Sequence, residues 1–134
     1  MYLNRLNEEQ KNLFIDLCIH ASLANNNFAD EEKNMIDLYC EEMNLKEHRY
    51  TANNSMDDAV SKLVAISTNE ELRIVLLEIS ALIISDNVYD NDEQNFMNSL
   101  VERIGFSEDK VSEMMGCLNE LTAVYNRLNM LVFG

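Results

Sequence analysis

Apolar residues recur every three or four positions along most of this chain, a spacing typical of amphipathic α-helices. Six stretches show it, at residues 8–24, 30–43, 56–67, 69–84, 91–104 and 108–132. The alternation of apolar and polar residues that is typical of a β-strand is not sustained over a useful length. The pattern predicts an all-α fold, a compact bundle of about six helices in a single domain spanning residues 1–134.

Polar residues mark where several of these helices begin. Thr68 and Glu71 have the spacing of a capping box, in which each side chain accepts a hydrogen bond from the other residue's backbone N–H. Asn7 and Gln10 have the same spacing before the first helix. Ser107 is the expected cap of the last helix.

The ends of two helices also have a signature. Asn44 and Gly105 each follow a helical stretch, and both residue types tolerate the left-handed conformation that commonly closes a helix. Between these ends, the stretch 69–84 is apolar on nearly all sides, which predicts a central helix covered by its neighbours. Proline is absent and glycine occurs three times, so few residues interrupt the helices.

The last stretch carries one unbroken apolar stripe whose steps alternate between three and four residues. The pattern predicts a single long helix, with Gly116 inside it at a slight bend or a close helix contact. The stripe consists of Val111, Met114, Leu118, Leu121, Tyr125, Leu128 and Val132.

One segment occurs twice, 61 positions apart. Residues 25–32 read Asn-Asn-Asn-Phe-Ala-Asp-Glu-Glu, and residues 86–93 read Asp-Asn-Val-Tyr-Asp-Asn-Asp-Glu. A predicted helix lies on each side of each copy. The chain is therefore expected to contain two pseudo-repeated helical hairpins.

The carboxylates of the repeated segment have two readings, and both stay open. Asp90 and Glu93 have capping-box spacing, so capping of a helix N-terminus is sufficient to explain them. Alternatively, Asp86, Asp90, Asp92 and Glu93, with Glu32 from the first copy, offer oxygen ligands to a hard divalent cation. The spacing is not that of an EF-hand loop. No other cofactor is indicated.

The charge of the chain restricts its partners. Ten basic residues against 24 acidic ones give a net charge of −14, which argues against direct binding to nucleic acid or to an anionic membrane. Cations and basic proteins remain as partners, and solubility alone is a sufficient reason for such a surface. A nucleic-acid mimic that occupies the groove of a DNA- or RNA-binding protein is the alternative.

Reactive side chains are few and scattered. Cys18, Cys40 and Cys117 are odd in number and widely spaced, so they are expected to be buried small apolar residues rather than a disulfide or zinc framework. His20 and His48 have no second ligand at metal spacing. Hydrolase motifs are absent, which favours a non-enzymatic protein. No signal peptide or membrane-spanning run is found, so a cytoplasmic location is expected.

The repeated segment resembles the motif of the TerB-like family, approximately Ala-Asp-Gly-x-h-x-x-x-Glu, where h is a hydrophobic residue. Residues 85–93 and 24–32 are the two copies of it here. The likeness covers approximately residues 10–115. This chain departs from the motif at Asn25, which replaces the Asp, and at both glycine positions, which are Asn26 and Asn87.

The resemblance implies a compact all-helical domain with internal pseudo-symmetry. It associates the chain with tellurite resistance, stress response and phage defence, and with a domain related to one found in DnaJ-type co-chaperones. It also implies divalent metal binding by Asp86, Glu93 and Glu32. The resulting prediction is a cytoplasmic accessory protein that acts through an unidentified protein partner, in an oligomeric state that the pattern does not specify.

Overall fold

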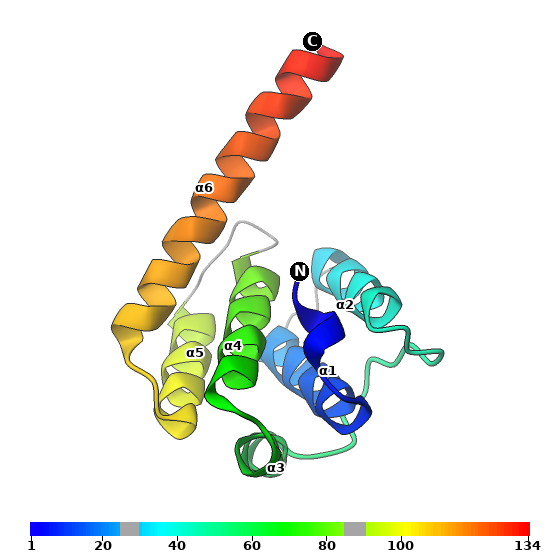
Figure 1. Cartoon of the computed structure of the whole chain (residues 1–134), viewed down its shortest axis with the longest axis vertical. Coiled ribbons are helices and arrows are strands. Elements are labelled where there is room, and N and C mark those ends of the chain that lie inside the picture. The colour runs from blue at the N-terminus through cyan, green and yellow to red at the C-terminus, as the bar shows by residue number, and fades with distance from the viewer. Residues whose placement is uncertain (25–29, 85–90) are drawn as a thin grey trace.

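The computed structural model describes residues 1–24, 30–84 and 91–134, and within these ranges it has helices and no strands. The predicted all-α fold is therefore confirmed (Figure 1). The elements are η1 (Leu3–Arg5), α1 (Glu8–Leu23), α2 (Asp30–Glu42), α3 (Met56–Ile66), α4 (Asn69–Ile83), α5 (Asn91–Ile104) and α6 (Glu108–Phe133).

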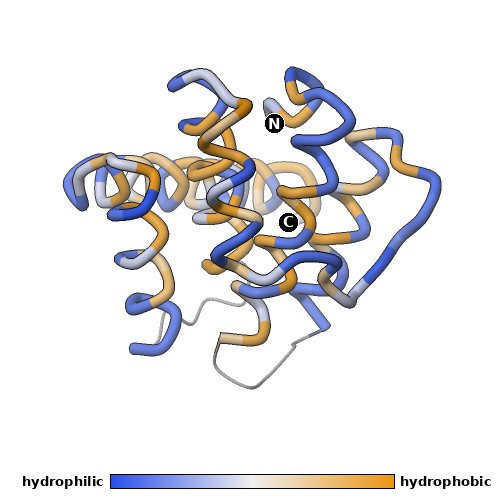
Figure 2. The backbone as a smooth tube through the Cα atoms, turned by 90° about the horizontal axis from the view of Figure 1, so that it is seen from below, coloured by the Kyte–Doolittle hydropathy of each residue, from blue (hydrophilic) through white to orange (hydrophobic). Residues whose placement is uncertain are grey.

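Helix α4 is the centre of the bundle, as its apolar sequence predicts. It packs against η1, α1, α2, α5 and α6, while α3 closes one end by contacting α1 and α5 (Figure 1). Val75, Leu76 and Ile79 of α4 are fully buried. Hydrophobic positions lie mainly where the helices face one another (Figure 2). No helix among the described residues is long and apolar enough to cross a membrane.

Both predicted capping boxes are present, and they start equivalent helices. Asn7 Oδ1 accepts from the backbone N–H of Gln10, and Gln10 Oε1 accepts from that of Asn7, both at 2.9 Å. Thr68 and Glu71 make the same pair of bonds at the start of α4, at 3.2 and 2.9 Å. The prediction for Ser107 is wrong in one respect: it precedes α6, but its side chain makes no capping hydrogen bond.

The chain leaves α2 and α5 in the same way, through one left-handed residue after each helix, here called the helix exit. Asn44 has φ +58° and Gly105 has φ +91°, so both adopt the predicted left-handed conformation. After each of them the chain folds back: Leu45 N–H donates to the Cys40 carbonyl at 2.9 Å, and Phe106 N–H donates to the Val101 carbonyl at 3.1 Å. The capping boxes and the exits of the two hairpins thus agree at the sequence offset, whereas the helix ends differ from it by one residue.

Helix α6 differs most from expectation. It is one long helix, but it leaves the bundle partway, and its C-terminal half extends beyond the other helices (Figure 1). Val111 and Leu118 are buried, whereas every stripe residue after Leu118 is exposed. Among the described residues, a Cβ placed on Gly116 would meet no atom of another helix within 4 Å, so none of the described helices makes a close contact there. Cys117 is exposed, which corrects its predicted burial; Cys18 and Cys40 are buried as predicted.

Candidate metal centre

Two glutamates of the repeated segment occupy equivalent places in the fold. Glu32 is the third residue of α2 and Glu93 is the third residue of α5. Their exposed fractions are 1% and 0%. Because a buried carboxylate is costly unless a cation, a hydrogen-bond donor or a helix dipole compensates it, the burial of the same position in both hairpins makes these residues the core of the candidate site.

The other predicted ligands are not brought together with them. Asp92, beside Glu93, is exposed and faces away from the core. Asp86 and Asp90 lie outside the described residues, and so does the predicted capping contact of Asp90 with Glu93. Among the residues that the structure describes, no group of three His, Cys, Asp or Glu side chains lies within reach of one metal ion. A centre with three such ligands would therefore have to include residues outside those ranges.

The helix starts themselves favour negative charge. Asp30, Glu31 and Glu32 form the first turn of α2, and Asp92 and Glu93 lie in the first turn of α5. The N–H groups and the positive end of the dipole at a helix start stabilise carboxylates there. This effect needs no metal, so the capping reading and the cation reading of these glutamates stand side by side.

A buried acid that the sequence reasoning overlooked lies on the central helix. Glu78 of α4 is 2% exposed, and its Oε1 accepts from the Met1 amino group at 2.8 Å. The amino group also lies 3.1 Å from Glu42 Oε1. Burial alone would lower the pKa of the Met1 amino group, but the bonds to Glu78 and Glu42 outweigh it, and the pKa is raised. The available signal was that Glu78 interrupts the apolar run 74–84.

A second overlooked acid anchors the polar connector between α2 and α3. Asp16 of α1 is fully buried, and its two oxygens accept from Arg49 Nη1, Asn54 Nδ2 and the backbone N–H groups of Asn53 and Asn54. Burial raises the pKa of Asp16, but the bonds from Asn54, Asn53 and Arg49 outweigh that effect and lower it. The signal was an Asp between Ile15 and Leu17 in an apolar stretch.

Each histidine has one neighbouring group that fixes its ring. His20 Nε2 lies 2.8 Å from the Asn54 carbonyl. His48 Nδ1 lies 3.1 Å from Asp37 Oδ1, which also accepts from Tyr50 Oη at 2.5 Å. The hydrogen bond from Tyr50 is the largest cause that lowers the pKa of Asp37. Both histidines therefore hold the connector 46–54 against α1 and α2.

Searches for similar proteins, with family models, curated sequences and solved structures, found no match to this chain.

Proposed function

We propose that this protein is a non-enzymatic, TerB-like cytoplasmic accessory protein of a stress response, which acts by protein contact and binds a divalent cation at its acidic inter-helix loops. The observation that supports the proposal best is the burial of Glu32 and Glu93 at equivalent positions of two hairpins. The resemblance of the repeated segment to the TerB-like motif connects these positions to metal binding.

The chemistry of the segment suits a hard cation. Asp86, Asp90, Asp92, Glu93 and Glu32 supply carboxylate oxygens, the ligands that Ca²⁺, Mg²⁺ and Mn²⁺ prefer. Histidine and cysteine, which favour zinc, are absent from both copies. We therefore expect the acidic loops to bind Ca²⁺, Mg²⁺ or Mn²⁺ rather than Zn²⁺.

Calorimetry tests the cation directly. We expect a saturable heat with at least one of Ca²⁺, Mg²⁺ and Mn²⁺ for the wild-type protein, and its loss in the Asp86→Ala/Glu93→Ala and Glu32→Gln variants. Because bound metal stabilises the folded state, the melting temperature should rise with metal concentration in the wild type but not in these two variants.

A matched control separates a site from general acidity. Glu31 adjoins Glu32 but is exposed, so Glu31→Gln removes the same charge from the same helix turn and should keep the heat. Circular dichroism checks that each variant remains helical. If no metal gives a heat with the wild type, or if Glu31→Gln and Glu32→Gln lose it equally, the cation part of the proposal is wrong.

The stress role is tested in the organism that carries the gene. Deletion should increase sensitivity to tellurite, and wild-type protein should restore growth whereas Glu32→Gln/Glu93→Gln should not. A deletion strain as resistant as its parent would exclude tellurite resistance while leaving the calorimetric result intact.

A further inference from the structure

The projecting half of α6 presents a continuous apolar surface that nothing in the described part of the chain covers. It consists of the four stripe residues after Leu118 together with two residues of the adjacent row, Val124 and Leu131. All six are 41–82% exposed: Leu121, Val124, Tyr125, Leu128, Leu131 and Val132. Monomeric proteins seldom expose an apolar patch of this length. The rows continue the stripe that begins with Val111 and Leu118 inside the bundle, so the surface is an extension of a packed helix face.

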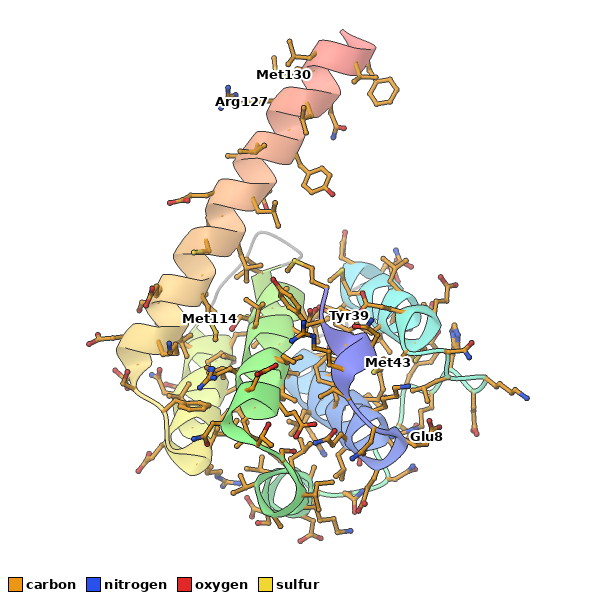
Figure 3. All side chains as sticks on the ribbon, viewed as in Figure 1. Glu8, Tyr39, Met43, Met114, Arg127 and Met130 are labelled. Atoms are coloured by element: carbon orange, nitrogen blue, oxygen red, sulfur yellow. The ribbon has the colours of Figure 1, made fainter. Side chains whose placement is uncertain are left out.

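This part of the chain carries almost none of the charge. Residues 119–134 contain one acidic side chain, Glu120, and one basic side chain, Arg127, so the whole net charge of −14 belongs to residues 1–118. Figure 3 shows Arg127 on the projecting part of α6, away from the bundle. Two copies of this protein repel each other through their bundles. The projecting part of α6 is where that repulsion is weakest.

The two charges also specify a register. Glu120 and Arg127 lie four residues before and three residues after Val124, and both flank the same edge of the stripe. An antiparallel pair with its twofold axis between residues 123 and 124 brings Glu120 of each copy opposite Arg127 of the other. A parallel pair instead places like residues at the same level. In the antiparallel pair the acidic bundles lie at opposite ends.

The apolar rows meet in the same register. The axis that pairs the charges brings Leu121 level with residue 126 of the second copy, next to its Tyr125. It also brings Leu128 of the second copy close to the level of Leu118. Leu118, Leu121 and Tyr125 also form one wall of a groove whose other wall includes Met35, Ala81 and Ile84. The C-terminal part of the second copy's α6 therefore reaches the apolar groove that α6 of the first copy forms with its α2 and α4.

The available area is sufficient for a dimer. At roughly 100 Å² for each large apolar side chain, the six residues offer about 600 Å² per copy before the groove is counted. Stable interfaces bury about 1,200–2,000 Å² in total, or about 600–1,000 Å² per partner, so the six residues reach the lower end of that range. We infer that α6 pairs in antiparallel orientation with α6 of a second copy, so that the protein is a homodimer in solution.

Sedimentation over a wide concentration range tests the dimer. We expect a reversible monomer–dimer equilibrium for the wild type and a monomer for Leu121→Ser/Leu128→Ser. The control Ala123→Ser/Met130→Ser alters exposed residues on the opposite face of α6 and should still dimerise. None of these side chains belongs to the bundle core, so each variant should fold, and circular dichroism checks that it does. A wild type that stays monomeric overturns the inference; co-flotation of that monomer with phosphatidylcholine vesicles would assign the surface to lipid instead.

A charge swap tests the register. Arg127→Glu replaces both Glu120–Arg127 pairs of the antiparallel dimer by pairs of acidic side chains. Because an exposed charge pair contributes little free energy, the dissociation constant should rise by only about tenfold. Glu120→Arg/Arg127→Glu restores two opposite-charge pairs only if the helices are antiparallel, so it should return the dissociation constant to the wild-type value. A double variant as weak as the single one would overturn the antiparallel register.

Discussion

Arg49 Nη1 donates a hydrogen bond to Asp16 Oδ1 over 2.6 Å, and this bond joins the polar connector to the middle of α1. Arg49 Nη2 also donates to the Asn12 carbonyl at 2.8 Å. The arginine thus bridges two points on α1, four residues apart. The second hairpin has no such anchor, because Leu77 stands at the position equivalent to Asp16.

Replacing Asp16 by Asn should destabilise the protein by about 3 kcal/mol, because it leaves a partly buried guanidinium without its counter-charge. The free energy of unfolding in urea measures the effect. Asp37→Asn is the matched control: Asp37 also accepts hydrogen bonds from connector residues, but it is partly exposed. Its loss should cost less than about 1 kcal/mol. Equal costs for the two variants would contradict a special role for the buried pair.

The same carboxylate should make stability depend on acid pH. The pKa of Asp16 is lower in the folded protein than in the unfolded chain, where the pKa of an Asp is about 3.9. Its contribution is therefore fully present above the unfolded pKa and is lost as the pH falls through the folded pKa. The difference in unfolding free energy between wild type and Asp16→Asn should stay constant from neutral pH to about pH 5 and shrink below about pH 4. A difference that does not change would show that charge is unimportant there.

The two helix exits should respond in opposite directions to substitution. Gly105→Ala should cost about 1 kcal/mol, because a Cβ strains the left-handed conformation. No atom of the residues that the structure describes lies within 4 Å of that Cβ, so the cost is one of backbone conformation. Asn44→Gly relieves the same strain at the equivalent position and should be neutral or slightly stabilising. Thermal melts of both variants provide the measurement, and a stabilising Gly105→Ala would refute this account.

The predictable features were those determined by neighbouring residues. Capping boxes and left-handed exits depend on side chains within a few positions, so Thr68 and Asn44 indicated their conformations from sequence alone. Periodicity showed which face of α6 is apolar, but not whether another part of the chain covers it, because coverage depends on where a long helix leaves the bundle. Leu3 and Leu6, buried at the N-terminus, were missed because so short an element has no periodicity to read.

In the candidate site, too, the sequence predicts features that depend on neighbouring residues and misses those that depend on distant segments. The repeat identified Glu32 and Glu93, and the structure buries both. Spacing within the segment suggested Asp92 equally, yet it faces solvent, since consecutive residues of a helix point about 100° apart. Asp16 and Glu78 were not singled out, because the groups that bind them lie far away in the sequence. Asp16 pairs with Arg49, and Glu78 pairs with the Met1 amino group.

The two capping boxes should be energetically coupled. Gln10 Nε2 donates to Ser67 Oγ at 2.9 Å, so the first box contacts the residue just before Thr68, where the second begins. Asn7→Ala and Thr68→Ala should each cost about 1 kcal/mol. Independent caps would give additive costs in the double variant, whereas a shared partner should give a departure of at least about 0.5 kcal/mol. Gln10→Ala in the same cycle should abolish the coupling.

The cysteines should differ in reactivity, and the reactivity of Cys117 tests the proposed dimer. Burial raises the pKa of the Cys18 and Cys40 thiols, and Cys117 alone of the three is exposed. A thiol reagent should therefore modify Cys117 alone in the native protein and all three in denaturant. Cys117 also stands seven residues before Val124, in the same row, which adjoins the α6 stripe. Antiparallel pairing would cover that row, so labelling should slow as concentration rises in the wild type but not in Leu121→Ser/Leu128→Ser. A rate independent of concentration in both proteins would separate Cys117 from the proposed interface.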